Sequence, residues 1–187
     1  MTASSAMSWA CQRRQQAAAA EHLRIPLLAN DLPRGIDITI DGADEVSPLL
    51  DLIKGGGAAM LCEKIVAQAS HRRVTVVDGS KLSPTLGARK SVPVEVVRFG
   101  WRRQAEYLHS LGADVTLRVV PGDVPFVTDQ GNLILDCAFG PIADPAGLAV
   151  RIRAKAGVVE HGLFVGLTTD LIVAGADGLR HLVPPGS

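Results

Sequence analysis

The sequence carries no net charge and few aromatic side chains, and each absence excludes a class of partner. Nineteen Lys and Arg residues balance nineteen Asp and Glu residues, so no overall field would attract a nucleic acid or an anionic membrane. Aromatic residues make up only 4% of the chain, too few for a surface that stacks bases. We therefore expect no nucleic-acid partner, and any anion site must be local.

Cysteine is scarce and histidine is scattered. Cys11, Cys62 and Cys137 are far apart and form no Cys-x-x-Cys pair, which argues against a disulfide framework and against a zinc site. The five histidines show no ligand spacing such as His-x-x-x-His. The sequence therefore predicts no metal centre.

Long hydrophobic runs are also missing. No stretch approaches the roughly 18 continuous apolar residues of a membrane span, and residues 1–16 lack the apolar run of a signal peptide. We expect no membrane partner and a cytoplasmic location. At 187 residues and 47% apolar composition, the chain can bury one sizeable core, or a core with a small satellite domain.

The first half of the chain predicts a parallel sheet. The β-branched run at 36–40 indicates a short buried strand, and apolar residues at Met60, Leu61, Ile65 and Val66 indicate a helix over 60–70 with one buried face. A second buried strand follows at 73–77. This strand–helix–strand order is typical of a βαβ unit. A helix over 15–23 and an extended segment over 25–28 are expected before it.

The second half of the chain predicts a different arrangement of strands and helices. We expect strands at 92–97 and 115–119, a helix over 102–111, and a hairpin of 125–128 with 132–137. A helix over 145–156 should follow, with Asp144 as its cap and Pro145 in its first turn. This succession resembles a small ferredoxin-like α+β unit. The apolar runs 163–165 and 171–174 are expected to rejoin the first sheet.

Residues 41–64 gather acid, base and glycine in one short window. They read Asp41-Gly42-Ala43-Asp44-Glu45, then Lys54-Gly55-Gly56-Gly57, then Glu63-Lys64. Asp41 falls at the carboxyl end of a predicted strand, where open α/β sheets place their ligands. The consecutive glycines let the backbone approach a ligand, and their N–H groups can hold an oxyanion or a phosphate. The window therefore predicts a binding or catalytic site.

Each part of the window also has a structural interpretation. Asp41 and Asp44 can satisfy backbone donors in an Asx-turn, and the glycines can be a flexible connector. Lys54 can be a solvated lysine, and Glu63 with Lys64 can be an exposed pair. If Glu63 faces the crevice instead, partial burial raises its pKa toward that of a general base. Lys81, after the next strand, either supplies charge to an anionic substrate or follows a helix cap.

Together these residues favour proton abstraction beside a carbonyl. A carboxylate base with donors for the enediolate oxygen is a general solution for aldose–ketose isomerisation, and it needs no metal or other cofactor.

Several ordered blocks resemble one known family. They are Ile40-Asp-Gly-Ala-Asp-Glu-Val46, Leu52-Ile-Lys-Gly-Gly-Gly-Ala-Ala-Met-Leu-Cys-Glu-Lys-Ile-Val66, Val77-Asp-Gly-Ser-Lys-Leu82, Val92-Pro-Val-Glu-Val96, Thr128-Asp-Gln-Gly-Asn-Leu-Ile-Leu-Asp136 and Gly157-Val-Val-Glu-His-Gly-Leu-Phe164. The blocks are similar to those of the ribose-5-phosphate isomerase, type A family, and the likeness runs from Ile25 to the C-terminus.

The resemblance implies an α/β fold with a Rossmann-like parallel-sheet domain (1–91 plus 163–187) and an inserted ferredoxin-like α+β lobe (92–162). It also implies a cytoplasmic homodimer or homotetramer that interconverts ribose 5-phosphate and ribulose 5-phosphate in the pentose phosphate pathway.

By motif position, the resemblance implies a role for each candidate residue. Glu63 would be the base, and Asp41 and Asp44 would engage sugar hydroxyls and assist ring opening. Lys54 and the following glycine amides would stabilise the enediolate, and Lys81 would lie near the phosphate end of the substrate. The substrate-binding set implied is Asp41, Gly42, Ala43, Asp44, Lys54, Gly55, Gly56, Gly57, Glu63 and Lys81.

The front of the chain departs from the family pattern. Members normally begin with a helix, a strand and a Gly-Thr-Gly-Ser/Thr loop that grips the sugar phosphate, and no such block stands here. Residues 11–16 replace a Thr/Ser-rich stretch, and Arg13 and Arg14 could act there as phosphate ligands. We expect an N-terminally truncated member. The alternative is a catalytically impaired paralogue, or a truncated product, that serves at most as a sugar-phosphate binding module.

Overall fold

The structure is a computed structural model that describes residues 21–25, 35–176 and 178–186. The predicted segments 15–23 and 25–28 fall largely outside these ranges, and Arg13 and Arg14 fall wholly outside them. No helix in the described ranges is long and apolar enough to cross a membrane.

The first sheet contains four strands in the order β1-β4-β12-β13. Strands β1 (Ile36–Asp41), β4 (Ser70–Asp78) and β12 (Asp170–Gly175) run parallel, and β13 (Gly178–Leu182) runs antiparallel to β12. The predicted strands at 36–40, 73–77 and 171–174 and the parallel sheet are thus confirmed. The expectation that the first of them is buried is wrong. In the described sheet β1 is the edge strand, and Ile38 and Ile40 are 46% and 67% exposed.

Helix α2 (Met60–Ala69) stands where the apolar pattern predicted it, but its buried face is rotated. Met60 and Val66 are buried as predicted, together with Lys64 and Ala67, whereas Ile65 is 46% exposed. Residues four and three apart share one helix face, so an inward Lys64 directs Ile65 toward solvent. The pattern misplaced Lys64 and Ile65 because the buried lysine has a partner, described below, that only the fold supplies.

The second sheet is antiparallel, with the strand order β10-β5-β9-β6. Its elements follow the chain as β5 (Val92–Val96), α3 (Trp101–Ser110), β6 (Asp114–Leu117), β9 (Leu133–Ala138), α4 (Pro145–Arg153) and β10 (Val158–His161). The last strand thus lies beside the first, which is the ferredoxin-like split βαβ arrangement. Helix α4 begins as predicted, since Asp144 Oδ1 accepts a hydrogen bond of 2.8 Å from the Gly147 N–H.

The predicted hairpin of 125–128 with 132–137 needs correction. Residues 125–128 form no hairpin strand with β9: Val127 makes only an isolated bridge to Leu133, although the turn closes with a 2.9 Å bond from Gly131 N–H to Thr128 O. Strand β8 (Val124–Pro125) pairs instead with β7 (Val119–Val120). Strand β9 already has β5 and β6 on its two edges, so little of it remains for a third partner.

The run at 163–165 does not rejoin the first sheet. Strand β11 (Leu163–Phe164) pairs with β3 (Leu52–Ile53), which in turn pairs with β2 (Glu45–Val46). This small sheet buries Phe164 against Val46 and Leu52 in a common hydrophobic cluster. The parallel sheet is continued instead by β12, which pairs with β4.

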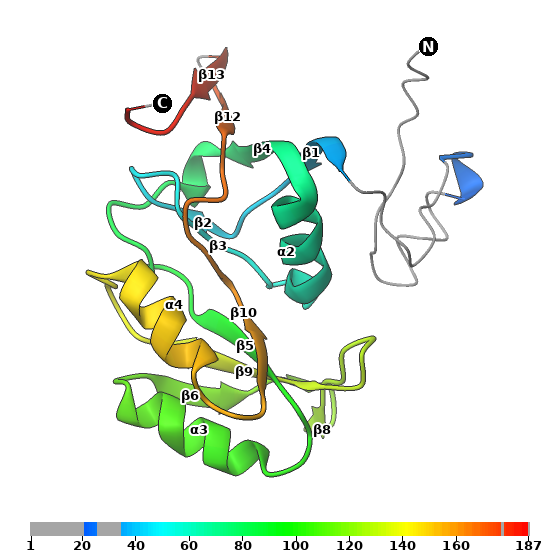
Figure 1. Cartoon of the computed structure of the whole chain (residues 1–187), viewed down its shortest axis with the longest axis vertical. Coiled ribbons are helices and arrows are strands. Elements are labelled where there is room, and N and C mark those ends of the chain that lie inside the picture. Colours follow the sequence, from blue (N-terminus) through cyan, green and yellow to red (C-terminus); the bar gives the residue numbers. More distant parts are fainter. Residues whose placement is uncertain (1–20, 26–34, 177, 187) are drawn as a thin grey trace.

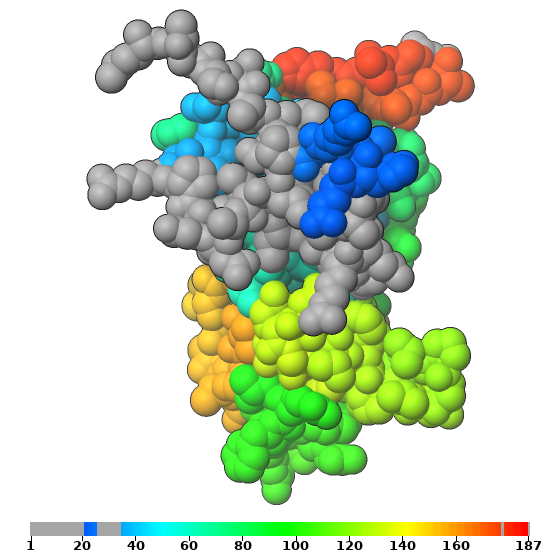
Figure 2. Space-filling view, turned by 90° about the vertical axis from the view of Figure 1, so that its right-hand side faces the viewer, coloured from blue at the N-terminus to red at the C-terminus, as the bar shows by residue number. Residues whose placement is uncertain are grey.

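The two larger sheets occupy opposite ends of the molecule. Figure 1 places β12 and β13 at one end and α3 at the other, and Figure 2 agrees after a quarter turn. Between them Lys54 N–H donates to Gly162 O (2.9 Å), and Gly162 N–H donates to Pro93 O (2.7 Å). A Cβ at Gly162 would lie 2.2 Å from Lys54 O, so only glycine fits this crossing. The predicted division into 1–91 plus 163–187 and 92–162 stays a prediction.

Candidate active site

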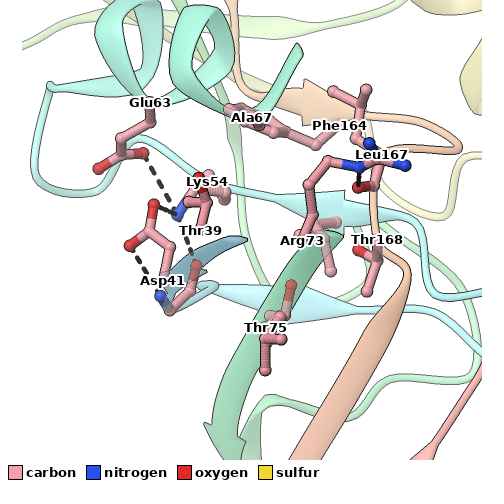
Figure 3. Close-up of a pocket in the computed structure, with 13 residues that line it drawn as sticks. Thr39, Asp41, Lys54, Glu63, Ala67, Arg73, Thr75, Phe164, Leu167 and Thr168 are labelled. Carbon is pink, nitrogen blue, oxygen red and sulfur yellow. Dashed lines mark hydrogen bonds and ion pairs between the residues drawn. The ribbon is translucent and has the colours of Figure 1, made fainter. Parts of the chain in front are cut away.

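Three charged side chains from three different elements meet at one point. Asp41 ends β1, Lys54 follows β3, and Glu63 lies in the first turn of α2. Lys54 Nζ lies 2.9 Å from Asp41 Oδ2 and 3.3 Å from Glu63 Oε2, and it also donates to Gly42 O at 2.5 Å. Figure 3 shows the ammonium group between the two carboxylates.

Lys54 is held in a nearly dry position. Its side chain is 7% exposed, and its Nζ lies 5.6 Å from the centroid of the Phe164 ring. A buried ammonium group is tolerated only when it is paired and hydrogen-bonded, and here two carboxylates and a carbonyl meet that need. Lys54 is therefore no solvated surface lysine.

Glu63 is a strong candidate for a general base. Its side chain is 14% exposed, and its buried Oε2 has no hydrogen bond within the described residues beyond the ion contact with Lys54. Burial raises the pKa of Glu63; Lys54 lowers it, Asp41 and Asp44 raise it further, and the net pKa lies above the ordinary value of 4.5. A carboxylate with a raised pKa is better matched to proton transfer near neutral pH.

The two aspartates combine structural and chemical contacts. Asp41 Oδ1 accepts 2.8 Å from the N–H of the next residue, Gly42, and not from the residue two positions on as an Asx-turn requires, while its other oxygen faces Lys54. Asp44 Oδ2 accepts 2.8 Å from Gly56 N–H. Ala43 packs between them against the core. The adjacent Glu45 is turned away and accepts N–H groups from the 87–90 loop.

The glycine turn is a fixed element and not a loose connector. Gly55 has φ of +103°, and a Cβ there would lie 2.8 Å from Met60 Sδ, so a side chain would meet both strain and a clash. The turn closes with a 2.9 Å bond from Ala58 N–H to Gly55 O. Gly56 N–H is engaged with Asp44, whereas Gly57 N–H has no partner among the described residues.

Sequence reasoning missed part of the pocket wall. Thr39, Arg73, Thr75 and Thr168 line the same pocket as Asp41, Lys54 and Glu63. The parallel register pairs Thr39 with Arg73 and Asp41 with Thr75, so alternation along β1 and β4 could have placed them on the site face. The Arg73 guanidinium is turned away from Lys54 toward Leu167 O, as Figure 3 shows.

Of the predicted site residues, Asp41, Gly42, Lys54 and Glu63 line this pocket, whereas Ala43, Asp44, the three glycines 55–57 and Lys81 do not. Lys81 lies in another segment. It ends the short 3₁₀ helix η1 (Gly79–Lys81), whose cap is Asp78 accepting 2.7 Å from Ser80 N–H. The predicted cap is thus present, and the role of Lys81 toward an anionic substrate stays a prediction. The interpretation of Glu63 and Lys64 as an exposed pair is wrong, because Lys64 is buried and pairs with Glu160 at 2.7 Å. Within the described ranges no group of three or more His, Cys, Asp or Glu could hold a metal ion.

A buried carboxylate beside a buried lysine, at the carboxyl end of a parallel strand, defines an acid–base site of the kind that isomerases use. The comparisons agree. Residues 11–178 match the family model of ribose 5-phosphate isomerase A (phosphoriboisomerase A). The chain therefore belongs to the ribose 5-phosphate isomerase A family.

Individual relatives give the extent of the likeness. A ribose-5-phosphate isomerase A of Chloroflexus aurantiacus is 58% identical over 163 residues, which cover 87% of this chain and 68% of the relative. One of Gluconobacter oxydans is 52% identical over 162 residues, 86% and 70% of the two chains. Among solved structures, the ribose 5-phosphate isomerase of Plasmodium falciparum superposes with a TM-score of 0.85 at 37% identity, covering 90% and 74%. A D-ribose-5-phosphate isomerase in complex with phospho-erythronic acid gives 0.86 at 36% identity, also covering 90% and 74%.

Proposed function

We propose that this chain interconverts D-ribose 5-phosphate and D-ribulose 5-phosphate, as a step of the pentose phosphate pathway. The observation that carries the proposal is Glu63, a largely buried carboxylate with a raised pKa that contacts Lys54 at 3.3 Å. Membership of the ribose 5-phosphate isomerase A family supports the choice of substrate.

The proposed reaction moves one proton between adjacent carbons. The Glu63 carboxylate takes the proton from C2 of the open-chain aldose, and the C–H electron pair forms the C1–C2 double bond of an enediolate. The electrons of the C1 carbonyl pass to O1. Protonated Glu63 then returns the proton to C1, while the O2 proton passes to O1 and leaves a ketone at C2. The sequence of steps needs no redox cofactor, because no electrons leave the substrate.

The remaining site residues have supporting roles in this proposal. Lys54 places a buried positive charge beside the base, where negative charge develops on the enediolate oxygens, and such charge stabilisation is a large catalytic term in a dry site. Asp41 and Asp44 contact sugar hydroxyls and assist ring opening. The backbone of Gly42, Ala43, Gly55, Gly56 and Gly57 lines the sugar, and Lys81 lies toward the phosphate end.

An isotope experiment tests the reaction and its intermediate together. The purified chain is incubated with D-ribose 5-phosphate in D₂O, and the product is examined by NMR. We expect ribulose 5-phosphate with deuterium at C1, because a proton held by Glu63 can exchange with solvent. Glu63→Ala is the matched control. Turnover no higher than that of the control would refute the proposal. The same holds if calorimetry shows that the chain binds the sugar phosphate but no conversion is detected.

We also propose that the chain acts in the cytoplasm as a homodimer or homotetramer. Light scattering on the eluting protein should give a mass of two or four times 19.7 kDa, and a monomeric mass with full activity would contradict this. Cell fractionation should recover the activity with the cytoplasmic fraction.

A further inference from the structure

Arg118 binds the carbonyl groups of the glycine turn. The residue directly follows β6, and its Nη1 donates 2.9 Å to Gly55 O and 3.2 Å to Gly56 O. One guanidinium nitrogen thus binds two successive carbonyl oxygens of the Lys54–Gly57 turn. This contact also joins the ferredoxin-like part of the chain to the candidate active site.

Arg118 is itself held firmly. Asp136 on β9 accepts from both Nε (2.9 Å) and Nη2 (2.5 Å), a two-point pairing that fixes the plane of the guanidinium. The Arg118 and Asp136 side chains are 18% and 27% exposed. The Arg118 backbone N–H donates to Ile134 O, and its carbonyl accepts from Phe126 N–H, both at 2.9 Å. The cation is therefore in place before any substrate arrives.

The hydrogen bonds from Arg118 fix the direction of two amide N–H groups. In a planar trans peptide the C=O and the following N–H point in opposite directions. Because Arg118 holds the carbonyls of Gly55 and Gly56, the N–H groups of Gly56 and Gly57 point away from it. The first donates to Asp44 Oδ2 at 2.8 Å, and the second has no partner among the described residues. A cation on a carbonyl also polarises the attached N–H and strengthens it as a donor.

Two other hydrogen bonds restrain the turn, from Ala58 N–H to Gly55 O and from Gly56 N–H to Asp44 Oδ2, but neither involves the peptide between Gly56 and Gly57. Glycine samples more backbone conformations than other residues, so loss of the Arg118 bond to Gly56 O would widen the range of directions open to the Gly57 N–H. An oxyanion site works by being oriented before the reaction. Loss of this bond should therefore weaken transition-state binding more than ground-state binding.

We propose that Arg118 and Asp136 are positioning residues for the reaction, holding the Gly57 amide toward the enediolate while the Gly56 amide stays bonded to Asp44. The inference rests on the proposed function of the site and deepens it. Neither side chain touches the substrate; both act through the glycine turn.

The test compares Arg118→Ala with Arg103→Ala. Arg103 lies on the exposed face of α3, its side chain is 78% exposed, and Glu106 is its only ion-pair partner in the part of the chain that the structure describes. For Arg118→Ala we expect kcat to fall by about 10- to 100-fold, less than the loss of a direct oxyanion donor, with KM changed by less than about threefold. Guanidinium chloride at millimolar concentration should restore part of kcat, because it can fill the vacated space beside Asp136. Arg103→Ala should keep the wild-type kcat and not respond to guanidinium.

Two further measurements keep the outcome decisive. Phospho-erythronic acid carries a carboxylate beside its first hydroxyl carbon, and the carboxylate oxygens stand in for the oxygens of the enediolate. Calorimetry should therefore show weaker binding of this acid to Arg118→Ala than to the wild type. If Arg118→Ala does not fold, Arg118→Lys and Asp136→Asn replace it, and each should lower kcat more than KM rises. If the wild type is active and kcat is unchanged in every variant that folds, the positioning role is overturned. If the wild type shows no turnover, the proposed function is overturned instead. In that case the positioning role is overturned as well if Arg118→Ala binds phospho-erythronic acid as tightly as the wild type does.

Discussion

Helix α2 carries two charged neighbours whose partners lie on different sides, and the two pairs contain the same chemical groups. Glu63 contacts Lys54 at 3.3 Å, and Lys64 contacts Glu160 at 2.7 Å. The Phe164 ring lies within cation–π range of both ammonium groups, 5.6 Å from Lys54 and 4.8 Å from Lys64. Both pairs are largely buried, yet their carboxylates differ in protonation behaviour.

The Lys64–Glu160 pair is saturated with donors. Glu160 accepts from Lys64, from Arg153 Nη2 at 2.6 and 2.8 Å, and from His161 N–H at 2.8 Å. Burial alone would raise the pKa of Glu160, but Lys64 and Arg153 outweigh it and hold the pKa at about 2. Such a carboxylate stays ionised and cannot serve as a base near neutral pH. Its role is to connect α2 to β10.

The Lys54–Glu63 pair is short of donors. Glu63 has one cation at 3.3 Å, which Lys54 shares with Asp41. Burial therefore dominates, and the pKa of Glu63 is raised. The comparison teaches that the number of donors reaching a buried carboxylate decides whether it becomes a proton-transfer group or a structural link. Four predictions test that difference, from the largest expected effect to the smallest.

Replacing the base should have the largest effect. Glu63→Gln keeps the shape of the side chain but cannot accept the C2 proton, so we expect kcat to fall by about 10³- to 10⁴-fold. The melting temperature should hold or rise, because a buried and poorly paired charge is removed. Steady-state kinetics and thermal unfolding measure the two quantities. A variant that retains more than a tenth of wild-type kcat would show that Glu63 is not the base.

Removing the shared cation should be the next largest change. Lys54→Met should lower kcat/KM by about 10²- to 10³-fold through loss of charge stabilisation. It should also move the pH profile. Glu63 works in its unprotonated form, so activity falls as pH falls through its pKa, and Lys54 lowers that pKa. Without Lys54 the acidic limb of kcat/KM should move to higher pH. A limb that stayed in place or moved to lower pH would contradict the electrostatic account.

Breaking the saturated pair should affect stability and spare chemistry. Glu160→Gln leaves Lys64 buried without its carboxylate, which we expect to cost about 3 kcal/mol, with kcat within about threefold of wild type. In the wild type the pKa of Glu160 is lowered from 4.5 to about 2. Its contribution is thus fully present above pH 4.5 and is lost as pH falls toward 2.

Urea unfolding of Glu160→Gln and wild type at pH 7 and pH 3 measures this contribution. The difference between the two proteins should shrink at pH 3. A difference that grew on acidification would mean that Glu160 is not the stabilising anion of this cluster.

These contrasts mark what the sequence could predict and what it could not. Asp41, Lys54 and Glu63 were predicted as one site because a strand end, a glycine turn and a helix start follow closely along the chain. Lys64 was misplaced because its partner, Glu160, stands 96 residues further on. Arg118 was missed for the same reason, since its carbonyl contacts lie 62 and 63 residues away. Local periodicity cannot report partners that only the tertiary fold brings together.

The smallest effect should come from the same substitution in an exposed pair. Glu106→Gln removes the partner of Arg103, but these side chains are 62% and 78% exposed. Water replaces the lost contact, and side-chain entropy is regained, so we expect less than about 0.5 kcal/mol of destabilisation. Urea unfolding beside Glu160→Gln gives the contrast directly. A loss as large as that of Glu160→Gln would mean that burial and donor number do not set the strength of these pairs, because Glu106 has one donor and lies in solvent.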